Sequence, residues 1–417
     1  MKRLRVLVVT QHFWPESFRI NEVVEDLRDA GADVTVLTGQ PNYPEGRIFA
    51  GYRAASLAFE RTPSGIPVHR VPLIPRARGR AHQLVANYLS FIASAGLLGP
   101  WALRGEPFDV VFVYGTSPIL QAIAAIVMKL LKRAALVTWV QDLWPDSLEV
   151  TGFVRDPKLL AAVRVAVEAI YRANDLLLVQ SEAFVAPVRA LSGQTAIEVH
   201  ANPGERSFQA PVSSLSPATS PPALHLGDGF NVVFAGNLGT VQALDTILDA
   251  AEQLRGTTVR IFLVGSGSRS EWLKTEIARR RLDMVQLPGR FPPEAMPAIL
   301  QQASALLVTL VRSPAMSQTV PSKVQAYLAA GRPVVAALDG EGARVVDAAG
   351  AGITCPAEDA AALALAITRL QTLSGKERKA MGERGRLYYE QHYDGPRLAR
   401  ALLGKLEAAV QHRKERT

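Results

Sequence analysis

Cysteine is almost absent from this chain. Cys355 is the single cysteine among 417 residues, which excludes an internal disulfide framework and a zinc site built from cysteines. Such sparing use of cysteine is typical of a reducing compartment, so we expect the protein in the cytoplasm. The composition, 48% hydrophobic and 20% charged, is that of a globular protein. A chain of this length predicts two domains, each with its own core.

Unbroken apolar segments long enough to cross a membrane are also missing. The apolar run near the N-terminus ends at Gln11 and His12, which is too short for a signal peptide and favours a first buried strand. Residues 84–103 approach the length of a membrane-spanning helix, but Asn87 and Pro100 interrupt them. We therefore expect a buried or interfacial helix in this segment.

Carboxylates are scarce around this segment. The net charge is +8, and between residues 51 and 100 one carboxylate, Glu60, stands against six arginines: Arg53, Arg61, Arg70, Arg76, Arg78 and Arg80. Cations beside apolar surface suit an anionic lipid layer, so we predict a peripheral protein at the inner face of the cytoplasmic membrane. A solvated arginine face explains the pattern equally well. No nucleic-acid partner is predicted, because no aromatic and basic module accompanies the charge.

Buried strands alternate with helical segments along the first half of the chain. Valine- and leucine-rich runs of this kind are typical of a parallel sheet covered on both faces, and they lie at 5–10, 33–38, 109–114, 135–140 and 176–179. The apolar face of residues 20–30 predicts the first crossover helix. Residues 1–206 therefore predict a doubly wound, Rossmann-like domain.

A second domain follows a break in this pattern. Residues 207–229 are rich in proline and serine, which predicts a linker. The alternation resumes over 230–380, with strands expected at 231–235, 259–264, 305–310 and 333–337. Long helices are expected over 381–417, packing back toward the first domain. The predicted fold class is α/β, with two doubly wound domains facing a central cleft where ligands bind at the carboxyl ends of the strands.

Glycine-rich turns follow the first two strands of the second domain. Gly236 and Asn237 come directly after one strand, and Gln242 opens the next helix, while Gly265 and Gly267 follow the second strand. Glycine lets the backbone approach a ligand, and a helix N-terminus attracts an anion. Each turn alone could be a tight turn without function. Two turns in succession favour a diphosphate site.

Two further loops of the second domain carry polar candidates. Ser322 and Lys323 follow Pro321 at the start of a predicted helix, where an ammonium group could neutralise a diphosphate leaving group. Lys323 is therefore a candidate catalytic residue, although a plain surface lysine fits the pattern too. Glu341, after a later strand, could bind a ribose or sugar hydroxyl, or simply cap the helix that follows.

These segments resemble a known family. Residues 322–337 are similar to the donor-binding helix and following strand of GT4-like retaining glycosyltransferases, and residues 234–239 are similar to the glycine loop of the same domain. In the first half, residues 12–16, 41–44 and 141–146 resemble the bacterial amino-sugar transferases of the WbuB type, which are described as fucosamine transferases. The resemblance implies the GT-B fold.

The sequence departs from the family at the donor site. The family's two glutamates fall at Gln318 and Ala326, and its arginine and lysine at the glycine loop fall at Asn237 and Gln242. The usual roles of the glutamates therefore do not carry over. We expect Lys323 to take over neutralisation of the diphosphate.

Two polar residues follow strands of the first domain. His12 comes after the first strand and Asp142 after a later one, so both are expected at the cleft. The imidazole could hydrogen-bond the acceptor or relay its proton, and the carboxylate could hold a sugar hydroxyl. A structural histidine and a helix-capping aspartate are the alternatives. If the family's retaining outcome holds, the departing phosphate accepts the proton and no strong base is required.

The resemblance implies transfer of a sugar, of a hexosamine type such as N-acetylfucosamine, from a UDP-sugar to a lipid-linked oligosaccharide in lipopolysaccharide O-antigen or capsule assembly. The UDP-sugar is a substrate, and no cofactor is expected. No metal is predicted, because the Asp-x-Asp motif of metal-dependent GT-A transferases is absent. A GT-B-shaped epimerase of UDP-amino sugars and a non-catalytic nucleotide-sugar-binding homologue are the alternatives.

Overall fold

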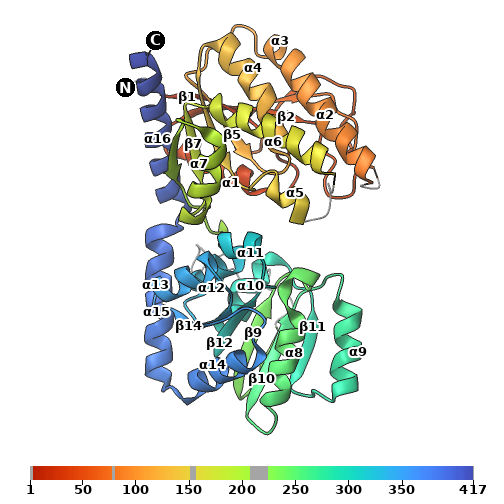
Figure 1. The fold of residues 1–417 in the computed structure, drawn as a ribbon, viewed down its shortest axis with the longest axis vertical. Helices are drawn as coiled ribbons and strands as arrows, with labels where there is room; N and C mark the ends of the chain where they lie inside the picture. Colours follow the sequence, from red (N-terminus) through yellow and green to blue (C-terminus); the bar gives the residue numbers. More distant parts are fainter. Residues whose placement is uncertain (1–2, 78–79, 151–155, 207–223, 417) are drawn as a thin grey trace. The chain divides into compact units, whose positions relative to one another are not determined.

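The computed structural model describes residues 3–77, 80–150, 156–206 and 224–416 (Figure 1). The chain divides into two compact units, one made of residues 1–203 with 395–417 and the other of residues 204–394. Most of the expected linker, 207–223, lies outside the described residues. The expected terminal segment 381–417 is divided between the two units, because its last helix belongs to the first unit and the helix before it to the second.

The first unit contains one sheet with helices on both faces. Its elements, with 3-10 helices marked η, are β1 (Arg5–Val9), α1 (Arg19–Asp29), β2 (Asp33–Gly39), β3 (Ala58–Arg61), β4 (Pro67–Val71), α2 (Ala81–Leu97), α3 (Gly99–Ala102), β5 (Val110–Gly115), η1 (Ile119–Gln121), α4 (Ala122–Lys132), β6 (Ala135–Val140), α5 (Asp146–Val150), α6 (Pro157–Arg172), β7 (Leu176–Val179), η2 (Glu182–Phe184), α7 (Val185–Ser192), β8 (Ala196–Val199) and α16 (Gly395–Arg416).

The eight strands of this sheet lie in the order β3-β4-β2-β1-β5-β6-β7-β8. All neighbouring pairs are parallel except β3 with β4. The chain runs outward from β1 on one side and returns to β5 on the other, so β1 and β5 flank the switch point of the sheet. Loops at the carboxyl ends of these strands are where an open α/β sheet binds ligands.

Side chains of each strand alternate between two cores. Leu7 and Val9 of β1 pack with α2, α4, α6 and α7, whereas Val6 and Val8 pack with α1 and α16. Leu402 and Leu406 of α16 are buried in the second of these cores, which explains why the C-terminal helix belongs to the first unit.

The second unit repeats this architecture with fewer strands. Its elements are β9 (Phe230–Ala235), η6 (Thr240–Gln242), α8 (Leu244–Gln253), β10 (Val259–Val264), α9 (Ser270–Arg280), β11 (Val285–Gly289), η7 (Pro293–Ala295), α10 (Met296–Gln301), β12 (Ala305–Thr309), α11 (Pro314–Gln318), α12 (Ser322–Ala330), β13 (Val334–Ala337), α13 (Glu341–Ala348), β14 (Gly352–Cys355), α14 (Ala360–Thr372) and α15 (Gly375–His392).

The six strands of this second sheet lie in the order β11-β10-β9-β12-β13-β14, and every neighbouring pair is parallel. Its switch point falls between β9 and β12. One face of the sheet packs against α8 and α14, and buried residues of α12 cover the other face. The two parallel sheets confirm the predicted doubly wound fold of both domains.

The strands that the sequence analysis missed are mainly at or near sheet edges. β3 and β8 alternate between exposed and half-buried residues, and most residues of β11 and β14 are only half-buried. Such strands lack the continuous apolar run that identifies a strand covered on both faces. β4, one position in from the edge, is buried but carries His69 and Arg70, which interrupt the apolar pattern.

The expected interfacial helix at 84–103 is divided between α2 and α3. None of the described helices combines the length and hydropathy that a membrane span needs.

The arginines between residues 51 and 100 do not form one solvated face. Arg70 is completely buried, and its guanidinium donates hydrogen bonds to Glu60 and to the backbone oxygens of Trp14 and Gly39. Arg70 therefore ties the end of β2 and the loop after β1 to β4. The exposed arginines of this region include Arg53, Arg61 and Arg80, while Arg78 lies outside the described residues.

Replacing Arg70 with methionine should lower the free energy of unfolding by at least about 3 kcal/mol, because Glu60 and two carbonyl groups lose their buried partner. Urea unfolding followed by tryptophan fluorescence measures the change. The matched control is Arg53→Met at an exposed position, where we expect a change below about 0.5 kcal/mol. Equal stability of the two variants would contradict a structural role for Arg70.

Candidate active site

A cavity of about 750 Å³ opens at the carboxyl ends of β9 and β10 in the second unit. This is the side of the sheet where an α/β fold binds ligands, and β9 is one of the two strands that flank the switch point. The predicted donor-site residues that line the cavity are Gly236, Asn237, Gln242, Gly265, Gly267, Ser322 and Lys323. Three separate segments of sequence are thus brought to one cavity.

Two glycines allow the loops after β9 and β10 to pack backbone against backbone. Both have a positive φ, +130° at Gly236 and +140° at Gly265, a region that side chains disfavour. A Cβ atom on Gly265 would lie 1.8 Å from the backbone oxygen of Gly236, and a Cβ on Gly236 would lie 2.7 Å from Cε of Lys323. The glycines are therefore required by the close approach of the two loops and of the lysine side chain.

Helix α12 brings Lys323 to this cavity. Four residues further along the same face, the buried Tyr327 hydroxyl accepts a hydrogen bond of 2.8 Å from the backbone N–H of Ala235, at the end of β9. This contact fixes the helix against the strand, and Lys323 lies one turn closer to the helix N-terminus. Ser322 is the first residue of the helix and is exposed.

The side chain of Lys323 is half-buried, and its ammonium group has no carboxylate partner. Its Nζ atom donates a hydrogen bond to Oε1 of Gln242 and lies 3.6 Å from the centre of the Phe234 ring. No carboxylate of the described residues lies within 4.0 Å of Nζ, the limit for an ion pair. Burial lowers the pKa of Lys323 from its usual 10.5 to about 7. An anion in the cavity would favour the charged form and raise this pKa.

Gln242, the hydrogen-bond partner of Lys323, is itself hydrogen-bonded to Thr309. The Thr309 hydroxyl, at the end of β12, donates a hydrogen bond of 2.5 Å to the backbone oxygen of Gln242. Gln242 is itself buried, so its side-chain oxygen has a fixed position beside the ammonium group. The neutral amide stabilises the cation without cancelling its charge.

Glu341 is not among the residues that line the cavity. It is the first residue of α13, and its buried carboxylate accepts hydrogen bonds from Arg344, at 3.0 Å from Nε and 2.7 Å from Nη2. The carboxylate therefore neutralises an arginine of its own helix. Glu341 is thus the one predicted donor-site residue of the second unit that does not line the cavity.

The cavity also contains residues that the sequence analysis did not select, among them Glu205, Arg290, Phe291 and Met296. Arg290 and Phe291 follow β11, an edge strand that the apolar pattern did not reveal, so the loop after it was missed too. Ala326 also lines the cavity, at one of the positions where the family resemblance places a glutamate.

Cations outnumber metal ligands around this cavity. Lys323 and Arg290 both contribute to its lining. In the portion of the chain that the structure describes, His, Cys, Asp and Glu side chains form no group of three or more that could hold a metal ion. The arrangement suits an anionic group held by nitrogen donors and by the N-terminus of α12.

Asp142 lies after β6 in the first unit. Its Oδ2 atom accepts two hydrogen bonds of 2.9 Å from Ser117, one from the backbone N–H and one from the hydroxyl. Ser117 follows β5, and its hydroxyl also accepts a hydrogen bond of 2.9 Å from the Trp144 ring. Asp142 therefore joins the loops after two neighbouring strands and is half-buried at the carboxyl edge of the sheet.

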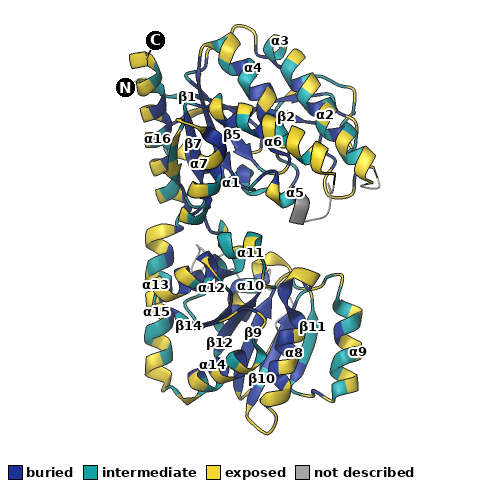
Figure 2. Cartoon of the chain, viewed as in Figure 1, coloured by how far each residue is buried: buried dark blue, intermediate teal, exposed yellow. Residues whose placement is uncertain are grey.

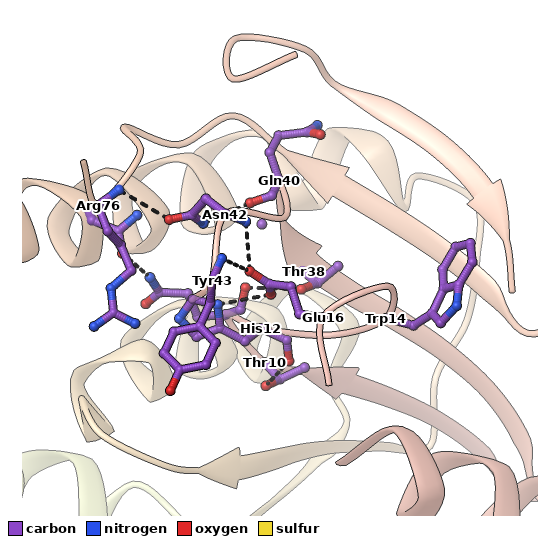
Figure 3. A network of polar contacts seen from close by, with 12 residues as sticks. Thr10, His12, Trp14, Glu16, Thr38, Gln40, Asn42, Tyr43 and Arg76 are labelled. Atoms are coloured by element: carbon purple, nitrogen blue, oxygen red, sulfur yellow. Dashed lines mark hydrogen bonds and ion pairs between the residues drawn. The ribbon is translucent and has the colours of Figure 1, made fainter. Parts of the chain in front are cut away.

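His12 lies after β1 on the same edge of the first sheet (Figure 3). Its Nδ1 atom is 3.0 Å from Oε2 of Glu16. Oε1 of Glu16 accepts hydrogen bonds from the backbone N–H groups of Asn42, at 2.7 Å, and Tyr43, at 2.6 Å. Glu16, which the sequence analysis did not select, thus connects the loop after β1 with the loop after β2.

Two family models match the chain, one on each unit. The model described as "Glycosyl transferase 4-like domain" matches residues 17–203, and the model "Glycosyl transferases group 1" matches residues 229–372. Two curated relatives are similar at low identity. The chain is 24% identical over 341 residues to WcaI of Escherichia coli (strain K12), a glycosyl transferase named for colanic acid biosynthesis, covering 79% of this chain and 82% of WcaI. It is 25% identical over 304 residues to the glycosyltransferase WbjE of Pseudomonas aeruginosa, covering 70% and 74%.

Solved structures share the whole fold. HepE of Anabaena, solved with UDP and glucose, has a TM-score of 0.66 and 17% identity, covering 97% of this chain and 100% of that chain. Sucrose-phosphate synthase of Thermosynechococcus elongatus has a TM-score of 0.64 and 17% identity, covering 98% and 100%. With one glycosyltransferase model on each of two doubly wound sheets, the chain belongs to the group 1, GT4-like glycosyltransferases of the GT-B fold.

Proposed function

We propose that the cavity of the second unit binds a UDP-sugar and that the protein transfers its sugar, with retention, to a lipid-linked oligosaccharide. The observation that carries this proposal is the half-buried Lys323 in the cavity lining: its ammonium group has no carboxylate partner, and desolvation lowers its pKa to about 7. Burial of an unpaired cation opposes folding, so a position of this kind is expected where a ligand supplies the negative charge. A diphosphate supplies such charge, and more of it develops when the sugar departs.

The rest of the cavity suits the same ligand. Gly236, Gly265 and Gly267 leave backbone surface open to a diphosphate, and Ser322 lies at the N-terminus of α12. Asn237 and Gln242 offer neutral amides where the family resemblance places cations. HepE was solved with UDP and glucose, which favours the same donor class for this protein. We propose no role at the donor for Glu341 beyond its pairing with Arg344.

The class of product follows from the relatives and from the motifs. WcaI is named for colanic acid biosynthesis, which supports a role in envelope polysaccharide assembly, such as O-antigen or capsule. The segments at 12–16, 41–44 and 141–146 resemble those of WbuB-type transferases. We therefore propose a hexosamine-type donor such as UDP-N-acetylfucosamine. Asp142 and His12 are proposed to hold hydroxyl groups of the substrates, since both lie at the ligand-binding edge of the first sheet.

Replacing Lys323 with methionine should abolish sugar transfer and weaken UDP binding by about 10- to 100-fold, the usual effect of removing a charged partner. Transfer is measured with a panel of UDP-sugars and lipid-linked acceptors, and UDP binding by calorimetry. The variant should fold, because it no longer has to bury an ammonium group. Lys274→Met, at an exposed lysine of α9 paired with Glu271, is the charge-matched control and should keep wild-type activity.

Three results would count against the proposed function. One is that the wild-type protein transfers no sugar from any UDP-sugar. Another is release of a free epimer from the donor without acceptor, which supports the epimerase alternative. The third is tight UDP binding without turnover of any donor and acceptor pair, as expected for a non-catalytic homologue.

UDP affinity should fall as the pH rises from 7 toward 9. In the free protein the pKa of Lys323 is about 7, and a bound diphosphate raises it by favouring the ammonium form. Binding therefore takes up a proton between these two pKa values, and the affinity decreases by up to about tenfold per pH unit. Calorimetry at several pH values measures the slope. Lys323→Met should remove the slope, and an unchanged slope in this variant would contradict the assignment.

A face of the first unit suits the membrane that holds a lipid-linked acceptor. Helix α2 carries no Asp, Glu, Lys or Arg, and it packs with α3 and α4. These helices carry exposed positions (Figure 2). The exposed apolar residues of these helices and of the turn between α2 and α3 are Val85, Leu89, Leu97, Leu98, Trp101, Ile123, Leu130 and Leu131. We call this set the α2–α4 face. Exposed apolar clusters of this kind mark interaction surfaces.

Charge around the α2–α4 face favours an anionic lipid surface over a protein partner. Residues 61–105 contain no Asp or Glu. The guanidinium of Arg104 lies 4.7 Å from the centre of the Trp101 ring, so an aromatic ring and a cation sit together. Both groups favour the interfacial region of a bilayer. We therefore propose that the protein binds peripherally at the inner face of the cytoplasmic membrane through this face.

Serine substitutions at Leu97, Trp101 and Leu130 together should weaken binding to anionic vesicles at least tenfold, since each apolar side chain that enters the bilayer contributes on the order of 1 kcal/mol. Vesicle flotation measures the effect. The matched control replaces three exposed apolar residues elsewhere with serine, namely Val165, Leu365 and Leu387, and should bind as wild type does. Equal binding of both triple variants, or a concentration-dependent dimer that the first variant abolishes, would contradict the lipid assignment.

A further inference from the structure

The imidazole of His12 makes a hydrogen bond through one of its two ring nitrogens, Nδ1. Its Nδ1 atom lies 3.0 Å from Oε2 of Glu16, and the two side chains are 7% and 1% exposed. The Phe18 ring stacks on the imidazole with ring centres 4.9 Å apart and planes 8° from parallel. The Tyr43 ring packs on it at 5.7 Å and a tilt of 56°. The orientation of the imidazole ring is therefore fixed by a hydrogen bond and by two aromatic contacts.

Glu16 receives hydrogen bonds from three directions. Besides the contact with His12, the backbone N–H groups of Asn42 and Tyr43 donate to Oε1. A backbone N–H group can only donate, so Oε1 is the acceptor in both bonds. No lysine or arginine of the described residues lies within 4.0 Å of the Glu16 carboxylate. An ionised carboxylate only accepts hydrogen bonds, so with Glu16 in that form the hydrogen between the two side chains belongs to Nδ1.

The loop that carries these donors is itself anchored. The side-chain oxygen of Asn42 accepts a hydrogen bond of 3.1 Å from the backbone N–H of Arg76, and the Arg76 guanidinium lies 5.0 Å from the centre of the Tyr43 ring (Figure 3). Asn42 is completely buried. The Glu16 carboxylate is therefore held by a loop that is itself anchored to the segment after β4.

The other ring nitrogen of His12, Nε2, is available to accept a hydrogen bond from a ligand. With a hydrogen on Nδ1, a neutral imidazole presents a lone pair at Nε2. Nε2 has no hydrogen bond within the described residues, and it is not among their fully buried atoms that lack a partner, so solvent reaches it. It lies beside the switch point of the first sheet, where ligands bind. A sugar hydroxyl is a donor that matches such an acceptor.

We propose that Glu16 is a positioning residue for sugar transfer. It holds His12 in the tautomer with hydrogen on Nδ1, so that Nε2 accepts a hydrogen bond from a hydroxyl of the sugar donor or of the glycan acceptor. This inference rests on the proposed transferase function for its kinetic consequence. The tautomer itself is a property of the protein alone and does not depend on the substrate.

Glu16→Gln tests the proposal with minimal change in shape. The amide oxygen still accepts from Asn42 and Tyr43, while the amide N–H group donates to Nδ1 and forces the hydrogen onto Nε2. Nε2 can then no longer accept the hydrogen of the substrate hydroxyl, which has to rotate and accept from Nε2 instead. We expect kcat/KM for transfer to fall between about 10-fold and 100-fold, with UDP binding in the second unit unchanged. Glu16→Asp keeps a carboxylate and should recover part of the loss.

Nitrogen-15 NMR of the histidine rings separates this role from a merely structural one. The wild-type protein should show His12 with hydrogen on Nδ1, and Glu16→Gln should show it on Nε2. In a His12→Ala background, Glu16→Gln should cause no further loss of transfer, because its effect acts through the imidazole. Glu45→Gln removes a charge from an exposed position of the same loop and is the control.

The kinetics also identify which hydroxyl is bound. If it belongs to the donor sugar, hydrolysis of the UDP-sugar without acceptor falls together with transfer; if it belongs to the acceptor, only transfer falls. A wild-type His12 with hydrogen on Nε2, or Glu16→Gln transferring at the wild-type rate, would overturn the proposal. A wild-type protein that transfers no sugar refutes the proposed function instead, while the NMR measurement still tests the tautomer.

Discussion

An ammonium group without a carboxylate partner, in the lining of a cavity, is the constraint on which the proposed donor site depends. The Phe234 ring and the Gln242 amide stabilise the Lys323 cation only partly, since burial still lowers its pKa to about 7. Folding tolerates this group because Tyr327 anchors α12 to the end of β9 and the glycine turns leave room for the side chain. An anion in this cavity would stabilise the charged form of Lys323.

The two units use one architecture with different polar groups. In each sheet the chain reverses direction at a switch point, between β1 and β5 in the first and between β9 and β12 in the second. The second unit presents a cation and backbone surface there, which suits a diphosphate. The first unit presents the imidazole of His12 and the carboxylate of Asp142, which suit uncharged hydroxyl groups. Charge is thus the basis on which we propose donor phosphate for the second unit and hydroxyl contacts for the first.

Buried polar contacts hold the loops of the first unit in place. Arg70 ties the end of β2 and the loop after β1 to β4, and Glu16 receives two backbone N–H groups from the loop after β2. Gln11 adds a link of 2.6 Å to Asn87 of α2. Through this link, the helix that carries the α2–α4 face contacts the residue next to His12.

The sequence by itself determined the fold class and most of the proposed donor residues that line the cavity of the second unit. Alternation of buried strands with helices, and the turns at Gly236 and Gly265 beside Lys323, are local patterns, and parallel strands bring such loops to one edge. Tertiary structure alone decided the partner of Arg70, the contact of Glu16 with the loop after β2 and the absence of a carboxylate beside Lys323. The physical reason is that desolvation and hydrogen-bond partners depend on packing, most of it between residues distant along the chain, and no local pattern of residues encodes them.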